Sequence, residues 1–231
     1  MGKVKWIIFA AVVILLLGGL IVYSRLNSEK TADIGDVNAN AVIAANDNNG
    51  QIGDHVFDNT ESSVVLVEYG DFQCPGCQAA NPNVMALLDT YGDKISFVFR
   101  NFPLTSIHPN ARAAAAAAEA AGLQGKYWEM HDYLYVEQNA WGNLDARQRT
   151  DTFKRYASSL GLDITKFETD LASANVNKKI SFDQTLGTNA GVSSTPTFIL
   201  NGEKLPEAAA NGLLQGDLTE IKKLLDEKLA E

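Results

Sequence analysis

The sequence predicts a mixed α/β domain that opens with a strand, a tight turn and a helix, and closes with a hairpin and a helix. A β-branched apolar run over 63–69 is typical of a strand buried on both faces. Apolar residues then recur at roughly helical spacing over 78–91. Near the other end, a strand-like run over 197–200 precedes Asn201-Gly202, the strongest short hairpin signal.

The remaining elements follow from composition along the chain. A second strand is expected over 94–100, which is rich in β-branched and aromatic residues. Helical patterns dominate from Pro109 to about Ala190 and start with an alanine block over 113–118. Alanine has the highest helix propensity of all residues. An amphipathic helix is expected from about 218 to 229. The order is strand, helix, strand, helical insertion, hairpin and helix.

Residues 1–26 predict a membrane anchor. Trp6 to Tyr23 is an uncharged run of about 18 residues, or about 27 Å as a helix, which is just enough to span a hydrocarbon core. Lys3 and Lys5 before the run are balanced by Arg25 and Lys30 after it, and the α-amine of the short N-terminal tail favours an N-terminus on the cytoplasmic side. A cleaved signal peptide is the alternative, although no A-x-A-like site follows Tyr23 directly. Either interpretation places the following domain outside the cytoplasm.

A flexible linker is expected over 27–54, which is rich in Asn, Asp, Ala and Gly and is interrupted by a short apolar run over 41–45. Residues 55–231 are then of ordinary size for one domain. The chain has 19 Lys and Arg against 28 Asp and Glu. Beyond residue 30 the balance is 15 against 27. This acidity argues against nucleic acid as a partner and against adhesion to anionic lipid.

The two cysteines of the chain, Cys74 and Cys77, lie between the first strand and the first helix of this domain. A bridge across two residues removes little entropy from the unfolded chain, so it would stabilise the fold poorly. The spacing instead favours sulfurs that cycle between dithiol and disulfide. Pro75 suits a first helical turn, which places Cys74 at the helix N-terminus. The free amides and the dipole there favour a reactive thiolate.

Two other interpretations of the cysteine pair are weaker. A structural zinc ion needs about four ligands, whereas His55, His108 and His131 are scattered and show no paired spacing. Two inert cysteines are also conceivable, but the Pro-Gly between them favours an exposed turn. The sequence therefore predicts a redox site without a metal or another cofactor.

These features together resemble the thioredoxin fold, and the inserted helices resemble its DsbA-like branch of bacterial thiol–disulfide oxidoreductases. The residues that carry the resemblance are the runs 67–77 (VEYGDFQCPGC) and 191–198 (GVSSTPTF), with His108-Pro109 and 125–129 (GKYWE) between them. The resemblance covers about His55 to the C-terminus, with a helical insertion over about 108–190. Pro75-Gly76 replaces the Pro-His pair of the strongest oxidants, which removes an imidazole that could stabilise the thiolate.

The resemblance also implies roles for residues outside the cysteine pair. Thr195 and Pro196 match the family's cis-proline turn, which lies against the active disulfide and pairs its backbone with substrate. Glu68, six residues before Cys74, matches a buried acid that manages the proton of the resolving cysteine. A solvent-facing strand position is the alternative for Glu68. Asp71 could share this role, but its place favours the turn.

The function expected from the resemblance is a single-pass cell-membrane oxidoreductase that introduces disulfides into exported proteins outside the cytoplasm. Its partners would be reduced or unfolded exported proteins and a membrane redox protein that reoxidises the pair. A reductase of the same fold is one alternative, since only the redox poise separates the two activities. A non-enzymatic binding module, or a module that delivers copper or zinc on the two thiolates, is another.

Overall fold

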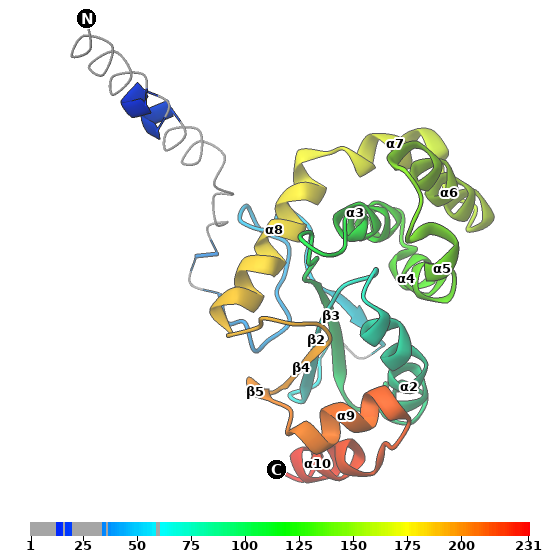
Figure 1. The fold of residues 1–231 in the computed structure, drawn as a ribbon. Helices are drawn as coiled ribbons and strands as arrows, with labels where there is room; N and C mark the ends of the chain where they lie inside the picture. The colour runs from blue at the N-terminus through cyan, green and yellow to red at the C-terminus, as the bar shows by residue number, and fades with distance from the viewer. Residues whose placement is uncertain (1–12, 16, 20–33, 36, 59–60) are drawn as a thin grey trace, which may run out of the picture. The chain divides into compact units, whose positions relative to one another are not determined.

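The computed structural model describes residues 13–15, 17–19, 34–35, 37–58 and 61–231 (Figure 1). The chain divides into two units, residues 1–31 and 32–231, which are described separately. In the first unit, residues 13–15 and 17–19 are helical. The predicted membrane span from Trp6 to Tyr23 falls mainly outside the described residues. Within the described residues, no helix has both the length and the apolar character needed to cross a membrane.

The second unit is built on a five-stranded sheet in the order β1-β3-β2-β4-β5. Its strands are β1 (His55–Phe57), β2 (Val65–Gly70), β3 (Ser96–Asn101), β4 (Thr197–Leu200) and β5 (Glu203–Lys204). β2 and β3 run parallel, while the other neighbouring pairs are antiparallel. Every residue of β2, β3 and β4 is buried. The mixed α/β class predicted from the sequence is confirmed.

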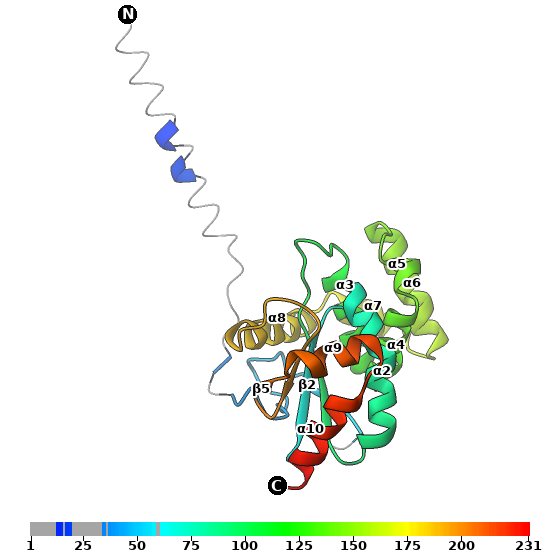
Figure 2. The ribbon, with the colours of Figure 1, turned by 60° about the horizontal axis from the view of Figure 1, so that its bottom comes forward.

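Helices cover both faces of the sheet and form an additional group beside it. α2 (Pro75–Tyr91), α9 (Glu207–Gln215) and α10 (Thr219–Leu229) pack on the face that carries Leu66. α8 (Ala174–Asn189) packs on the opposite face, against Val67 and Tyr69 (Figures 1 and 2). The additional group consists of α3 (Ala111–Gly122), α4 (Tyr127–Val136), α5 (Gln138–Trp141), α6 (Ala146–Ser159) and α7 (Ile164–Leu171).

The segment before β1 is packed on the domain, so the predicted linker over 27–54 is wrong for its C-terminal part. Ile43 and Ile52 are buried. Arg100 in β3 donates hydrogen bonds to the carbonyl oxygens of Ala39 at 2.5 Å and Ala41 at 2.8 Å. These contacts join residues that lie about sixty positions apart, so the polar composition of the segment did not reveal them.

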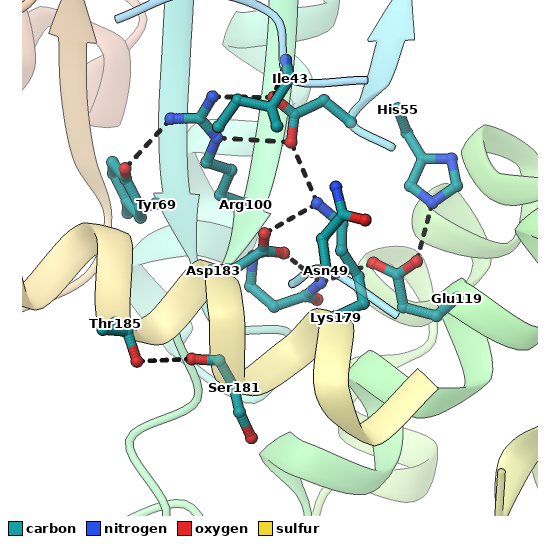
Figure 3. Close-up of polar contacts among 12 residues, drawn as sticks. Ile43, Asn49, His55, Tyr69, Arg100, Glu119, Lys179, Ser181, Asp183 and Thr185 are labelled. Atoms are coloured by element: carbon teal, nitrogen blue, oxygen red, sulfur yellow. Dashed lines mark hydrogen bonds and ion pairs between the residues drawn. The ribbon is translucent and has the colours of Figure 1, made fainter. Parts of the chain in front are cut away.

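A buried set of charges fixes the end of this segment (Figure 3). Asp54 Oδ2 lies 2.7 Å from Arg100 Nη2, and Asp54 Oδ1 lies 3.0 Å from Lys179 Nζ. Lys179 also pairs with Asp183 at 2.7 Å, and these side chains are almost completely buried. Burial opposes ionisation of Asp54, but the charges of Lys179 and Arg100 outweigh it and hold the Asp54 pKa well below its usual range. Asp54 is therefore a buried anion that joins the N-terminal segment, β3 and α8.

Asp54→Asn should destabilise the domain by about 3 kcal/mol, because it leaves two buried cations short of a carboxylate partner. The free energy of unfolding, measured by urea denaturation at pH 7, checks this value. Asp170→Asn is the control, since Asp170 pairs with Lys166 on the surface of α7. An exposed pair of this kind contributes about 0.5 kcal/mol or less. Equal losses in the two variants would contradict the structural role of Asp54.

Candidate active site

The cysteine pair lies where β2 turns into α2. Cys74 is the N-cap of α2, with φ −75° and ψ 123°, and Pro75 occupies the first helical turn. The Cys74 N–H donates to the Asp71 carbonyl at 3.0 Å, which closes the turn before the helix. Both cysteines are free thiols, and Cys74 is 8% exposed whereas Cys77 is 1% exposed. Both cysteines are therefore buried at the helix start, and Cys74 is the more exposed of the two.

The two sulfurs have opposite acidities. A hydrogen bond from Cys77, helped by the backbone N–H groups of Gly76 and Cys77, lowers the pKa of Cys74 to about 5. Burial, with the hydrogen bond to Cys74 and the charge of Glu68 adding to it, raises the pKa of Cys77 well above its usual value. At neutral pH Cys74 is therefore a thiolate while Cys77 keeps its proton. This is the asymmetry that a nucleophile and its resolving partner need.

The turn before β4 closes over the pair. The Thr195-Pro196 peptide bond is cis, and the Thr195 carbonyl oxygen lies 3.3 Å from Cys74 Sγ. A Cβ atom on Gly76 would lie 3.3 Å from Pro196 Cδ and 3.6 Å from Cys74 Sγ. Glycine between the cysteines therefore lets this turn approach the pair closely. The structure brings together Cys74, Cys77, Thr195 and Pro196, which the sequence singled out separately.

Glu68 is buried and not solvent-facing, since only 3% of the residue is exposed. It sits within β2, opposite Phe99 of β3 and Phe198 of β4. Burial, with the negative charge of Cys74 adding to it, raises the pKa of Glu68 to about 8. Since this value lies close to neutral pH, Glu68 can both accept and release a proton under ordinary conditions.

Asp71 holds the turn between β2 and α2 in place through several hydrogen bonds, and its backbone also faces Cys77. Its carboxylate accepts hydrogen bonds from the backbone N–H groups of Gln73 at 2.7 Å and Leu104 at 2.9 Å. The same carboxylate lies 2.8 Å from His108 Nδ1. The Asp71 N–H also points at Cys77 Sγ, 3.5 Å away. His108, which the sequence indicated only as part of the His108-Pro109 run, therefore helps to hold the loop after β3 against the active-site turn.

Two glutamines tie the additional helices to the site, and sequence analysis missed both. Gln138 in α5 donates to the carbonyl oxygens of Phe72 at 2.8 Å and Cys74 at 3.1 Å. Gln73 donates to the Gly142 carbonyl at 2.7 Å. No local pattern marks a glutamine that bonds a backbone group more than sixty residues away. In the described part of the chain, no group of three or more His, Cys, Asp or Glu side chains could hold a metal ion.

Solved structures with a similar fold include thiol–disulfide exchange proteins. A thioredoxin-like oxidoreductase from Silicibacter pomeroyi is 27% identical and superposes with a TM-score of 0.57 over 74% of this chain and 92% of that one. BdbD from Bacillus subtilis is 22% identical, with a TM-score of 0.62 over 83% and 99%. The exchange protein alpha-DsbA2 from Wolbachia pipientis is 22% identical, with a TM-score of 0.61 over 74% and 85%.

The curated relatives are longer proteins that are named as Na⁺/H⁺ antiporters. A Na⁺/H⁺ antiporter NhaA 1 from Salinispora arenicola is 44% identical over 151 residues, which are 65% of this chain and 22% of the relative. NhaA from Herminiimonas arsenicoxydans is 33% identical over 152 residues, or 66% and 23%. The chain spans less than a quarter of the length of these relatives.

A family model described as thioredoxin matches residues 51–219, which include both cysteines, Glu68 and the Thr195-Pro196 turn. The match extends over most of the chain and includes the helices between β3 and β4. The chain therefore belongs to the thioredoxin family and has a DsbA-like fold.

Proposed function

We propose that this protein is a thiol–disulfide oxidoreductase that introduces disulfides into exported proteins through Cys74 and Cys77. The observation that carries the proposal is the opposite acidity of the two sulfurs at the start of α2. In the oxidised state, a substrate thiolate attacks Cys74 Sγ, breaks the bond between Cys74 and Cys77, and forms a mixed disulfide. A second substrate thiolate attacks the substrate sulfur of that bond. The substrate leaves as a disulfide, and the enzyme keeps both electrons as a dithiol.

The acidity of Cys74 favours oxidation over reduction as the net direction. A thiol with a pKa of about 5 is a good leaving group and is stabilised in the reduced protein. Stabilisation of the reduced form makes the disulfide a stronger oxidant. This acidity arises although Pro75-Gly76 supplies no imidazole, because the Cys77 thiol and backbone N–H groups supply the hydrogen bonds.

The redox potential of the pair tests the direction. Equilibration of the protein with glutathione buffers, followed by alkylation and mass analysis, should give a value less negative than about −200 mV. A potential near −270 mV, roughly that of a thioredoxin, would instead support the reductase alternative.

The turn at Thr195-Pro196 is proposed as the substrate-binding edge. It lies directly beside Cys74 Sγ, and its family counterpart pairs with extended peptide. An unfolded chain offers backbone N–H and C=O groups in this form, so the site suits reduced polypeptides of varied sequence. A membrane protein that accepts electrons from the reduced pair is the proposed recycling partner.

We further propose that the N-terminal segment anchors the protein in the cell membrane with the catalytic domain outside the cytoplasm. The support is the uncharged run from Trp6 to Tyr23 and the α-amine of the short tail before it. The full chain should stay in the membrane fraction after an alkaline wash. A cysteine-free reporter fused after Glu231 should lie outside the cytoplasm. Recovery of a soluble form that begins near Arg25 would replace the anchor with a cleaved signal peptide.

A further inference from the structure

A cluster of aromatic and polar side chains lies next to Glu68 and has no role in the thiol chemistry described so far. Glu68 stands opposite Phe99 in the β2–β3 pair, so both side chains project from the same face of the sheet. A Cβ atom on Gly70 would lie 2.2 Å from the Phe99 ring and 3.2 Å from Glu68 Oε1. The carboxyl group and the ring therefore meet over Gly70. The Phe99 ring in turn contacts His131, with centroids 4.9 Å apart, and lies 6.3 Å from Tyr135.

Several buried polar atoms in this region lack a hydrogen-bond partner among the described residues. They are Tyr135 Oη, His131 Nε2, Tyr127 Oη and Asn101 Oδ1. The rings of Tyr127 and Tyr135 lie 6.2 Å and 5.0 Å from that of His131. A buried polar atom without a partner costs about 1–3 kcal/mol, and folded proteins usually satisfy such atoms with internal water. The rings of Tyr127 and Tyr135 both contact His131, and internal water would supply the partners that their hydroxyls and His131 Nε2 lack.

The cluster continues to the protein surface through β1. The Tyr127 ring stacks on His55, with centroids 3.7 Å apart and an interplanar angle of 9°. His55 Nε2 lies 2.8 Å from Glu119 Oε2, and Glu119 Oε1 accepts from Asn101 Nδ2 at 2.7 Å (Figure 3). The Glu119 side chain is fully buried, whereas 16% of the His55 side chain is exposed. His55 therefore provides an outlet to solvent for a group of atoms that begins at Glu68.

We propose that Tyr135 and His131, bridged by internal water, form a proton path that joins Glu68 to the Glu119–His55 pair at the surface. This inference rests on the proposed function, because it assigns the route of the proton that disulfide exchange requires. Tyr135 and His131 act as positioning residues, since they reach the sulfurs only through Glu68 and water.

The proton balance of the reaction shows why such a path is needed. When a substrate thiolate attacks Cys74 Sγ, the bond to Cys77 breaks and Cys77 leaves as a thiolate in a buried site. Protonated Glu68 gives Cys77 its proton, so that the electron pair and the proton both remain on that sulfur. The Glu68 carboxylate must then regain a proton from solvent. During reoxidation of the pair by its partner, the proton travels the opposite way.

The acidities of the cluster fit a relay. Burial, with the negative charges of Cys77 and Glu68 adding to it, raises the pKa of Tyr135 well above its usual value, so its hydroxyl stays a donor. Burial lowers the pKa of His131 and outweighs the opposing effect of the Asp132 carboxylate, which lies 3.1 Å from Nδ1, so the ring is neutral. With Nδ1 donating to Asp132, Nε2 can accept a proton. Many titratable groups share this region. They are Cys74 at the N-cap of α2 and Cys77 within it, Asp71 from the turn, Asp54 and His55, Glu119 from α3, Tyr127, His131, Asp132 and Tyr135 from α4, and Lys179 and Asp183 from α8.

Tyr135→Phe tests the path, because it removes the hydroxyl and keeps the ring. Tyr133→Phe is the matched control in the same helix, since the Tyr133 ring stacks on Tyr156 at 5.2 Å, outside the cluster. In stopped-flow single turnovers with a reduced thiol peptide, Tyr135→Phe should be about tenfold slower than wild type and should show a larger solvent isotope effect in D₂O. His131→Phe should be slowed similarly. The double variant should be no slower than the slower single one, since both act in one path. Rates and isotope effects equal to those of Tyr133→Phe would overturn the proposal.

A second measurement does not depend on turnover. In reduced protein labelled with ¹³C at glutamate carboxyl groups, Tyr135→Phe should raise the pKa of Glu68 by about one unit, because a water-mediated donor to the carboxylate is lost. The same titration in Tyr133→Phe should match wild type. An unchanged Glu68 titration in Tyr135→Phe would overturn the path even if the enzyme is active. Conversely, Tyr135→Phe could shift the Glu68 titration in a protein whose wild type transfers no disulfides. That result would support the hydrated connection and refute the proposed function.

Discussion

Cys74→Ser should abolish disulfide transfer, because the serine hydroxyl forms no disulfide with a substrate sulfur. In the wild-type protein, the rate of alkylation by iodoacetamide should rise with a midpoint near pH 5, the pKa of Cys74. At pH 7 nearly all of Cys74 is then thiolate. A thiol at the ordinary value of 9.0 is only about 1% thiolate, so its reaction should be up to about a hundredfold slower. A midpoint near pH 9 would contradict the activation of Cys74 by the hydrogen bonds around it.

Variants of Cys77 separate its role as a resolving thiol from its role as a hydrogen-bond donor. Cys77→Ser and Cys77→Ala should both trap mixed disulfides between Cys74 and substrates. The serine hydroxyl can still donate to the Cys74 sulfur, whereas alanine cannot. The pKa of Cys74 should therefore rise more in Cys77→Ala than in Cys77→Ser, because the hydrogen bond from Cys77 is the main cause of its low value. Equal alkylation profiles for the two variants would assign the acidity to groups other than the Cys77 side chain, which include Thr195 and the backbone N–H groups.

Local patterns predicted much of the fold and of the sulfur site. The buried strand β2 has a continuous apolar run, and α2 has helical spacing behind a proline in its first turn. Asn201 and Gly202 have positive φ angles of 46° and 87°, as a two-residue hairpin loop requires. Each of these features is determined by residues that are neighbours in the sequence.

The elements that the sequence missed depend on contacts between distant residues. β1 has only three residues, and its pairing with β3 gives no periodic signal. α9 contains Asn211-Gly212, which by itself favours a turn. In the structure, a Cβ atom on Gly212 would lie 2.2 Å from the Asp217 carbonyl oxygen, so glycine is needed for a close backbone approach within a helix. The packing of residues 39–54 likewise depends on Arg100 and Lys179, far along the chain.

Glu68→Gln should stabilise the reduced domain by about 3 kcal/mol at pH 7, since a pKa of about 8 in the folded state against an ordinary 4.5 penalises the ionised form. Below pH 4.5 the carboxyl group is protonated in both folded and unfolded states, so the wild-type domain should then be as stable as the variant. Wild-type stability should be lost relative to the variant as the pH rises from about 4.5 to about 8, and the difference should level off above that range. Glutamine keeps the shape and polarity of the neutral acid, so it removes the titration alone.

Urea denaturation of both proteins between pH 4 and pH 9 under reducing conditions measures this difference. Glu203→Gln is the control, because Glu203 is exposed in β5. In the oxidised state, the stabilities of wild type and Glu68→Gln should differ less. The negative charge of reduced Cys74 contributes to the raised pKa of Glu68, and this charge is absent in the disulfide. Glu68→Gln should also slow disulfide transfer, because Cys77 loses its proton donor and acceptor. A stability difference that does not change with pH would show that ionisation of Glu68 does not destabilise the folded domain. An unchanged rate of disulfide transfer would show that Glu68 exchanges no proton with Cys77.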